Sequence, residues 1–142
     1  EQNALMALDV AHRGYVLGAT SCLRETLKPE DRDGFIRRCL DVAGGRELLF
    51  KLHPNENHAR ARQEIERLAP RALVFDSGNT NHMIANCAAL VTRYSSVVHV
   101  AIALGKEVHA DIDELTLRRL MPIQNGGTSA RRIADACRRF LS

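Results

Sequence analysis

Five short apolar segments, each followed by a stretch with helical spacing or a turn, constrain the fold of this 142-residue chain most strongly. They are residues 15–19 (YVLGA), 47–52 (ELLFKL), 72–76 (ALVFD), 88–92 (AALVT) and 107–110 (EVHA). Continuous apolar runs of this length are typical of strands buried on both faces of a parallel sheet. The alternation therefore predicts an α/β fold in which helices cover both faces of the sheet.

The helices expected between these strands have apolar residues at intervals of three and four. They are residues 4–12, a helix carrying Phe35, Ile36 and Cys39, residues 58–68, a short helix carrying Met83, Ile84 and Cys87, and residues 97–104. The helix at 97–104 has one polar residue, His99, so it should be covered on most sides. A further helix within 111–121 should be interrupted by Pro122, and a last one carries Ile133 and Cys137.

Right-handed crossovers between these strands give a doubly wound, Rossmann-like sheet, most simply in the order 3-2-1-4-5. We expect a single domain spanning 1–142 with this fold. Ligands of such sheets bind at the carboxyl ends of the strands, where the strand order reverses. The predicted crevice is lined by Gly18, Ala19, Thr20 and Ser21 on one side and by residues 94–96 on the other. His53 stands one strand further along.

Composition excludes several classes of protein. The net charge is only +3 and the basic residues are scattered beside acidic ones along the predicted helices, so no nucleic-acid partner is expected. The four cysteines are widely spaced, and Cys39, Cys87 and Cys137 fall on apolar helix stripes, which indicates buried thiols in a reducing, cytoplasmic compartment. No apolar run is long enough to span a membrane. Because the first residue is Glu1, we expect the chain to be a piece of a longer polypeptide.

Tyr94, Ser95 and Ser96 precede a predicted helix, whose first backbone N–H groups lack partners within the helix. Hydroxyl groups at that position make a candidate phosphate site, although a serine there can equally cap the helix. Gly18 and Thr20 belong to a small-residue turn in which the backbone could approach a phosphate closely. This turn contains neither G-x-G-x-x-G nor G-K-[ST], so a dinucleotide fingerprint and a Walker-type nucleotidase are excluded.

His53 and Pro54 end the second strand, because proline cannot donate to a sheet ladder. A histidine there could donate to a phosphate, or simply end the strand without a role. Asp111-Ile112-Asp113 resembles a metal-binding D-x-D, but acidic residues also favour a helix start by charge alone. No histidine pairs with a second histidine or with a cysteine three or four residues away in one predicted element, so no structural zinc or other metal site is predicted.

Three segments taken together resemble the C-terminal half of GT-B glycosyltransferases: LLFKLHPNE, VTRYSSVV and ALGKEV. The resemblance is to the capsule-polysaccharide biosynthesis group, which includes Kdo transferases, bacterial polysialyltransferases and CDP-glycerol glycerophosphotransferases. It implies that His53, Ser95 and Ser96 contact the nucleotide of a CMP- or CDP-activated donor. Two positions depart from the group: Val100 stands where a glutamate usually meets the donor ribose, and Glu107 replaces a proline.

A GT-B enzyme binds its acceptor and usually carries its catalytic base on an N-terminal lobe that this chain lacks. The resemblance therefore implies a donor-binding domain without activity of its own and without a required metal or other cofactor. Its partners would be the nucleotide-sugar donor and, through the missing lobe, a polysaccharide or glycolipid acceptor, with the full protein at the inner face of a membrane. Two alternatives remain: half of a UDP-N-acetylglucosamine 2-epimerase-like protein, which shares the fold and an H-P-N-like segment, and a non-catalytic Rossmann-like interaction module.

Overall fold

A computed structural model describes residues 14–20, 28–93, 95–124 and 135–139, with the backbone alone for residues 121–124. The chain divides into two compact units, Glu1–Asp111 and Ile112–Ser142. All five strands lie in the first unit: β1 (Val16–Ala19), β2 (Leu48–Lys51), β3 (Leu73–Phe75), β4 (Ala89–Val91) and β5 (Glu107–His109). Each lies inside one of the apolar segments that predicted it, and is one to two residues shorter.

The strand order is β3-β2-β1-β4-β5, as predicted, and every neighbouring pair is parallel. The register is set by central pairs such as Gly18 opposite Phe50 in β2 and opposite Val91 in β4. The order reverses between β1 and β4, so the carboxyl ends of these two strands flank the switch point of a doubly wound sheet.

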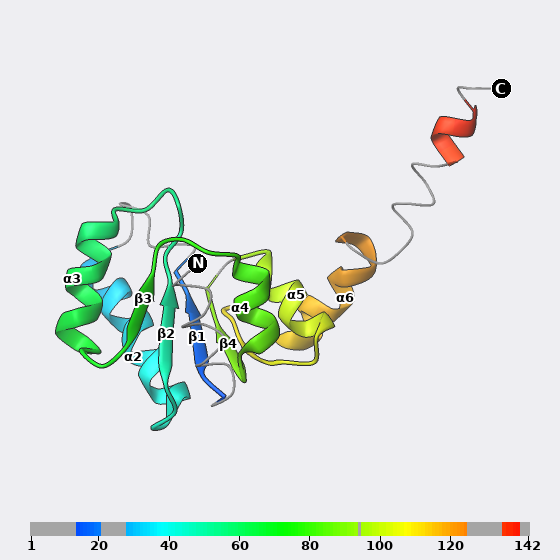
Figure 1. The fold of residues 1–142 in the computed structure, drawn as a ribbon. Helices are drawn as coiled ribbons and strands as arrows, with labels where there is room; N and C mark the ends of the chain where they lie inside the picture. Colours follow the sequence, from blue (N-terminus) through cyan, green and yellow to red (C-terminus); the bar gives the residue numbers. More distant parts are fainter. Residues whose placement is uncertain (1–13, 21–27, 94, 125–134, 140–142) are drawn as a thin grey trace. The chain divides into compact units, whose positions relative to one another are not determined.

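Helices cover both faces of the sheet (Figure 1). On one face lie α2 (Pro29–Ala43) and α3 (His58–Leu68), and on the other lie α4 (Thr80–Asn86) and α5 (Val97–Ala103). Because successive strand residues point to opposite faces, two separate apolar clusters form. One contains Phe35, Ile36 and Ile65 packed on the even-numbered residues of β1 and β2, and the other contains Met83, Ile84 and Ala101 packed on the odd-numbered ones.

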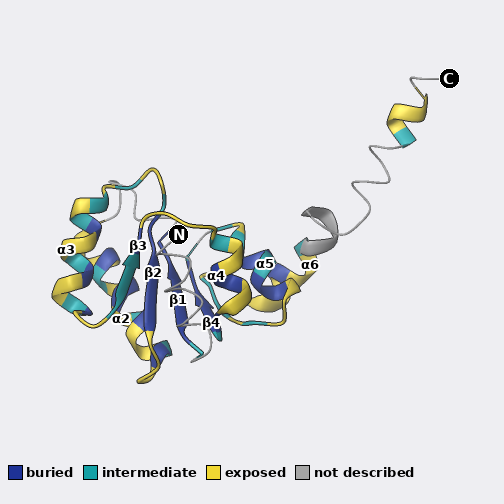
Figure 2. Cartoon of the chain, viewed as in Figure 1, coloured by how far each residue is buried: buried dark blue, intermediate teal, exposed yellow. Residues whose placement is uncertain are grey.

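The central strands are buried along their whole length (Figure 2). Helix α5, between β4 and β5, is also well covered, as its apolar sequence predicted. Its one polar residue, His99, is only 5% exposed. The Nδ1 atom of His99 has no hydrogen-bond partner among the described residues. Tyr15 adds a polar tie within the core, since its hydroxyl donates to the Met83 carbonyl at 2.5 Å.

Local signals explain where the helices begin and end. Pro29 occupies the first turn of α2, and Gly44 ends that helix in the left-handed region, with φ 54°. The side chain of Asn57 caps α3 by accepting from the Arg60 N–H at 3.0 Å, and Asn79 caps α4 in the same way. These caps lie in the loops that follow β2 and β3, so they also shape the carboxyl edge of the sheet.

Two predictions about the second unit are wrong: that its first helix is interrupted by Pro122, and that Cys137 is buried. Helix α6 (Glu114–Gln124) runs past Pro122 instead of stopping there. Proline has a helical φ, and the hydrogen bond and space that its ring costs fall in the last turn, where only two residues follow. Cys137 is exposed, because an apolar stripe is buried only where another element packs on it, and residues 135–139 are mostly exposed. Cys39 and Cys87 are buried, as expected. The predicted helix at 4–12, the start of the last helix, and Cys22 lie outside the described residues.

Candidate functional site

A cavity of about 170 Å³ lies at the carboxyl edge of the sheet, beside the switch point. Four segments meet there: the end of β1, the end of β2 with the turn that follows it, the loop between β3 and α4, and the start of α5. The residues lining it are Ala19, Lys51, Leu52, His53, Pro54, Gly78, Thr80, Ser95 and Val97. The cavity therefore lies where a doubly wound sheet is expected to bind a ligand.

The structure brings together four of the residues singled out in the sequence: Ala19, His53, Pro54 and Ser95 line this cavity. Gly18, Thr20 and Ser96 do not line it. Gly18 lies inside β1, where an added Cβ would meet the ring of Phe50 at 2.8 Å, so its small size serves packing between strand and helix. Thr20 is buried and directs its hydroxyl toward the Lys51 carbonyl and Glu56. Ser21 and Tyr94 lie outside the described residues.

The two serines before α5 differ in their surroundings. Ser95 is half-buried, and its Oγ accepts weakly from the Val97 N–H at 3.4 Å. Ser96 is exposed and its side chain makes no capping hydrogen bond. Val100, which the resemblance aligned with a glutamate, does not line the cavity but packs against the apolar cluster beneath α5. Of the two serines, Ser95 is therefore the one that lines the cavity.

The ring of His53 has a defined hydrogen-bonding role. Its Nδ1 accepts from the backbone N–H of Asn55 at 3.1 Å. In a neutral imidazole, one nitrogen accepts and the other carries the proton. His53 is therefore held in the tautomer whose Nε2–H is a donor, which suits an anionic ligand in the cavity that the residue lines.

Glu56 lies behind His53 and joins the ends of two strands. Its Oε1 accepts from the His53 backbone N–H at 2.6 Å and from the Thr20 hydroxyl. Its Oε2 is buried without a hydrogen-bond partner among the described residues. Burial raises the pKa of this carboxyl above its usual range, against the opposing effects of the two hydrogen bonds and of the nearby His58 and Arg60 charges.

This raised pKa predicts a pH dependence of stability. A carboxyl that binds its proton more tightly when folded stabilises the protein fully below its unfolded pKa, about 4.3, and loses that contribution as the pH rises through the folded value. The difference in free energy of unfolding between the wild type and Glu56→Gln should therefore fall as the pH rises from about 4 to about 7. Urea denaturation across this range measures it. A difference that rises with pH would mean that the partners of Glu56 outweigh its burial.

Lys51 is a component of the site that sequence reasoning missed. It is the last residue of β2, is 7% exposed, and donates through Nζ to the carbonyl of Leu52 at 2.9 Å and toward that of Asp76 at 3.4 Å. Burial lowers its pKa, while Asp76 and Glu56 act in the opposite direction. The signal available in the sequence was the lysine of K-L-H-P, which interrupts an apolar strand two residues before His53.

The two carboxylates of the D-x-D segment bind other groups of the protein. Asp111 pairs with two guanidinium groups, Arg38 at 2.6 Å and Arg93 at 2.9 Å, and Asp113 accepts from the Thr116 N–H at 2.9 Å. These arginines hold the pKa of Asp111 below its usual value, against the effect of its burial. Within the described part of the chain, no group of three or more His, Cys, Asp and Glu is arranged to hold a metal ion.

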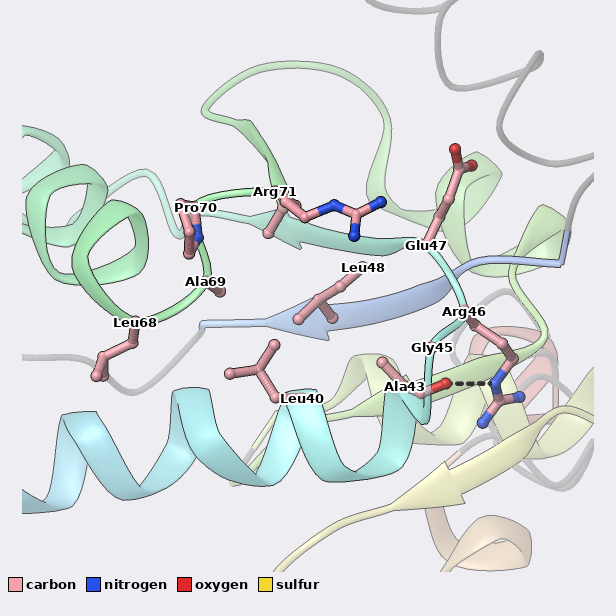
Figure 3. A pocket seen from close by; sticks show the side chains of 11 residues that line it. Leu40, Ala43, Gly45, Arg46, Glu47, Leu48, Leu68, Ala69, Pro70 and Arg71 are labelled. Atoms are coloured by element: carbon pink, nitrogen blue, oxygen red, sulfur yellow. Dashed lines mark hydrogen bonds between the residues drawn. The ribbon is translucent and has the colours of Figure 1, made fainter.

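A second cavity, of about 330 Å³, lies at the opposite edge of the sheet, between the end of α2 and the entries to β2 and β3 (Figure 3). Its lining combines leucines, including Leu40, Leu48 and Leu68, with the charged side chains of residues 46, 47 and 71. Arg46 at its rim donates to the Ala43 carbonyl at 3.1 Å. This edge holds the amino ends of the strands, away from the switch point.

No helix in the described residues is long and apolar enough to cross a membrane.

No protein-family model matches the sequence, and no curated protein sequence matches it either. Solved structures do match. One is UDP-GlcNAc 2-epimerase from Neisseria meningitidis bound to UDP-GlcNAc, with a TM-score of 0.52 and 15% identity over 68% of this chain and 27% of that one. Another is MnaA from S. aureus in complex with UDP, with a TM-score of 0.54 and 15% identity over 72% of this chain and 29% of that one.

This chain thus spans less than a third of the length of either neighbour. At this identity the likeness concerns the fold, and it supports a GT-B-like half without singling out the capsule group. The five-stranded parallel sheet and its helices form a Rossmann-like α/β unit that matches one half of a GT-B-like fold.

Proposed function

We propose that this chain is the nucleotide-binding half of a GT-B-like enzyme acting on a nucleotide-activated sugar, and that the cavity beside the switch point binds the phosphate groups. The observation that carries the proposal is the lining of this cavity. Its polar side chains, Lys51, His53, Thr80 and Ser95, can all donate hydrogen bonds, and no carboxylate is among the lining residues. A small cavity with donors, one of them a cation, favours an anion such as a phosphate.

The size of the cavity indicates that this chain supplies only part of the binding site. At about 170 Å³ it is smaller than the roughly 300–1,000 Å³ pockets that enclose drug-sized ligands. It would hold the phosphates while the sugar and base extend outside. A second lobe, outside this chain, would supply the remaining contacts, the acceptor where there is one, and the acid–base groups. The isolated chain should therefore bind a nucleotide without turning over a nucleotide sugar, and no metal is required by this scheme.

Two reactions are candidates for the complete protein. Fold similarity to UDP-GlcNAc 2-epimerases, one with UDP bound, favours a UDP-sugar enzyme. The K-x-H-P segment and the serine pair favour a transferase with a CMP- or CDP-activated donor for a surface polysaccharide, working in the cytoplasm at the membrane face. The base preference of the isolated chain separates these two candidates.

The proposal is tested by titrating the chain with UDP, CDP and CMP. Binding is measured by calorimetry and by the shifts of the amide NMR signals. We expect one of the nucleotides to bind with shifts at His53 and Ser95, and the nucleosides uridine and cytidine to bind far more weakly because they lack phosphate. Lys51→Met should weaken binding by about tenfold or more, the scale of a charge-assisted hydrogen bond.

Lys106→Met is the matched control, because it removes the same charge from a lysine that does not line the cavity, and it should leave the affinity unchanged. Equal binding of UDP and uridine would contradict a phosphate site. Absence of binding at millimolar nucleotide would contradict the proposal and favour a non-catalytic interaction module.

A further inference from the structure

The His53 residue is held by contacts to its backbone and ring. Its N–H points to Glu56 Oε1 at 2.6 Å and to Thr20 Oγ1 at 3.2 Å. Its carbonyl accepts from the Glu56 N–H at 3.2 Å and lies 2.9 Å from His58 Nε2. Its ring Nδ1 accepts from the Asn55 N–H. The turn at residues 53–58 thus surrounds His53 with partners, and two of these contacts come from Glu56.

Glu56 does not line the cavity, so it affects a ligand there through residues that do: by its hydrogen bond to His53 and by its charge near Lys51. Because Glu56→Gln removes the charge but keeps an acceptor for His53, it separates these two routes. Glu56 occupies an unusual position for a carboxylate, since one oxygen serves donors from the ends of two strands and the other is buried without a partner among the described residues. A buried charged group with an unsatisfied oxygen is unfavourable for folding. Its placement is better explained by what it holds than by the stability it adds.

We propose that Glu56 is a positioning residue, which holds the His53 backbone at the end of β2 so that the ring keeps its Nδ1 bond to Asn55 and directs Nε2–H to an anionic group in the cavity. This proposal rests on the proposed function for its ligand. The hydrogen-bond geometry itself is independent of it.

Loss of the carboxylate would affect His53 more than Thr20. The Thr20 hydroxyl also reaches the Lys51 carbonyl at 3.1 Å and would keep that partner. The His53 N–H would keep only the longer contact to Thr20 Oγ1 at 3.2 Å. The residue would then be free to shift, and the Asn55 bond that selects the ring tautomer would be the first to loosen.

Three variants of the full chain test this role: Glu56→Ala, Glu56→Gln and Asn57→Ala. Glu56→Gln keeps one oxygen acceptor. Asn57→Ala is the matched control, because it removes the N-cap of α3 in the same turn but no contact of His53. The readouts are the ring ¹⁵N shifts of His53, which report its tautomer, and the affinity for UDP and CDP.

We expect Glu56→Ala to mix the tautomers of His53 and to weaken nucleotide binding by about five- to tenfold, the factor of one net hydrogen bond. Glu56→Gln should restore the Nε2–H tautomer and most of the affinity, and Asn57→Ala should keep both although it destabilises the fold. An unchanged tautomer and affinity in folded Glu56→Ala would overturn the proposal, as would equal effects in Asn57→Ala. If the wild type binds neither nucleotide, the proposed function fails, and the ¹⁵N shifts alone still decide whether Glu56 positions His53.

Discussion

Replacing Arg32 with methionine is expected to lower the free energy of unfolding by about 3 kcal/mol, at the lower end of the effects seen when one partner of a buried ion pair is removed. The Arg32 side chain is 8% exposed and that of Glu64 is 15% exposed. The guanidinium of α2 donates to the carboxylate of α3 through Nε at 2.9 Å and through Nη2 at 2.8 Å. Without Arg32, the Glu64 carboxylate would remain largely desolvated between two helices.

The lower end of the range applies because Nε of Arg60 lies 4.0 Å from Oε1 of Glu64. The guanidinium of Arg60 would therefore partly neutralise the charge of the Glu64 carboxylate. Urea denaturation measures the change, read from the midpoint at constant m-value. The double variant Arg32→Met with Glu64→Leu should recover much of the loss, since it removes both charges together. A single variant that loses less than about 1 kcal/mol would mean that the pair behaves like an exposed salt bridge.

Replacing Gly18 with alanine is expected to lower the free energy of unfolding by about 2 kcal/mol, as overpacking of a core does. The added Cβ would lie 2.8 and 2.9 Å from two ring atoms of Phe50 and 3.1 Å from Sγ of Cys39. The Phe50 side chain extends from β2 into the apolar cluster that includes Phe35, Ile36 and Ile65, and it is completely buried. Its ring therefore has little room to move. The smaller side chain of Phe50→Leu should relieve the clash, making the double variant more stable than additivity predicts.

Gly34 provides the matched control for Gly18. It lies within α2, and nothing is within 4 Å of the position of its Cβ. Gly34→Ala should be neutral or stabilising by up to about 1 kcal/mol, because alanine restricts the unfolded chain. Comparison of the two variants by thermal or urea unfolding separates steric contact from backbone entropy. If Gly18→Ala were as stable as Gly34→Ala, then β1 would have enough freedom to absorb a methyl group.

The Gly18 variant also separates two roles for this residue. The sequence suggested a turn that approaches a phosphate, whereas the structure places the glycine against Phe50. Folded Gly18→Ala should therefore retain nucleotide affinity under conditions in which Lys51→Met loses it. Calorimetric titration at a temperature where both variants are folded tests this expectation.

The sequence alone predicted the architecture because the signals for it are local. Apolar runs, the spacing of helix faces and the turn residues gave every strand in the described part of the chain, and short right-handed crossovers then left the order 3-2-1-4-5 as the simplest arrangement. The same order predicted that His53 and Ser95 would meet at one edge, and they line one cavity. The local signal failed at Pro122, which lies in the last turn of α6, where the cost of a proline is confined to the helix end and two further residues stay helical.

Only the tertiary structure decided which side chains point into that cavity and which support it. Gly18 lies within the predicted strand, and the alternation of side chains along the strand turns it to the helix face. Thr20 directly follows the strand and bonds to residues 31 and 36 positions away. Lys51 carries a sequence signal only as a charged residue within an apolar strand, and Glu56 carries none. Part of the role of each comes from a contact distant along the chain, with Asp76 for Lys51 and with Thr20 for Glu56. Secondary structure follows from neighbours in sequence. The chemistry of a site follows from neighbours in space, which a single sequence does not specify.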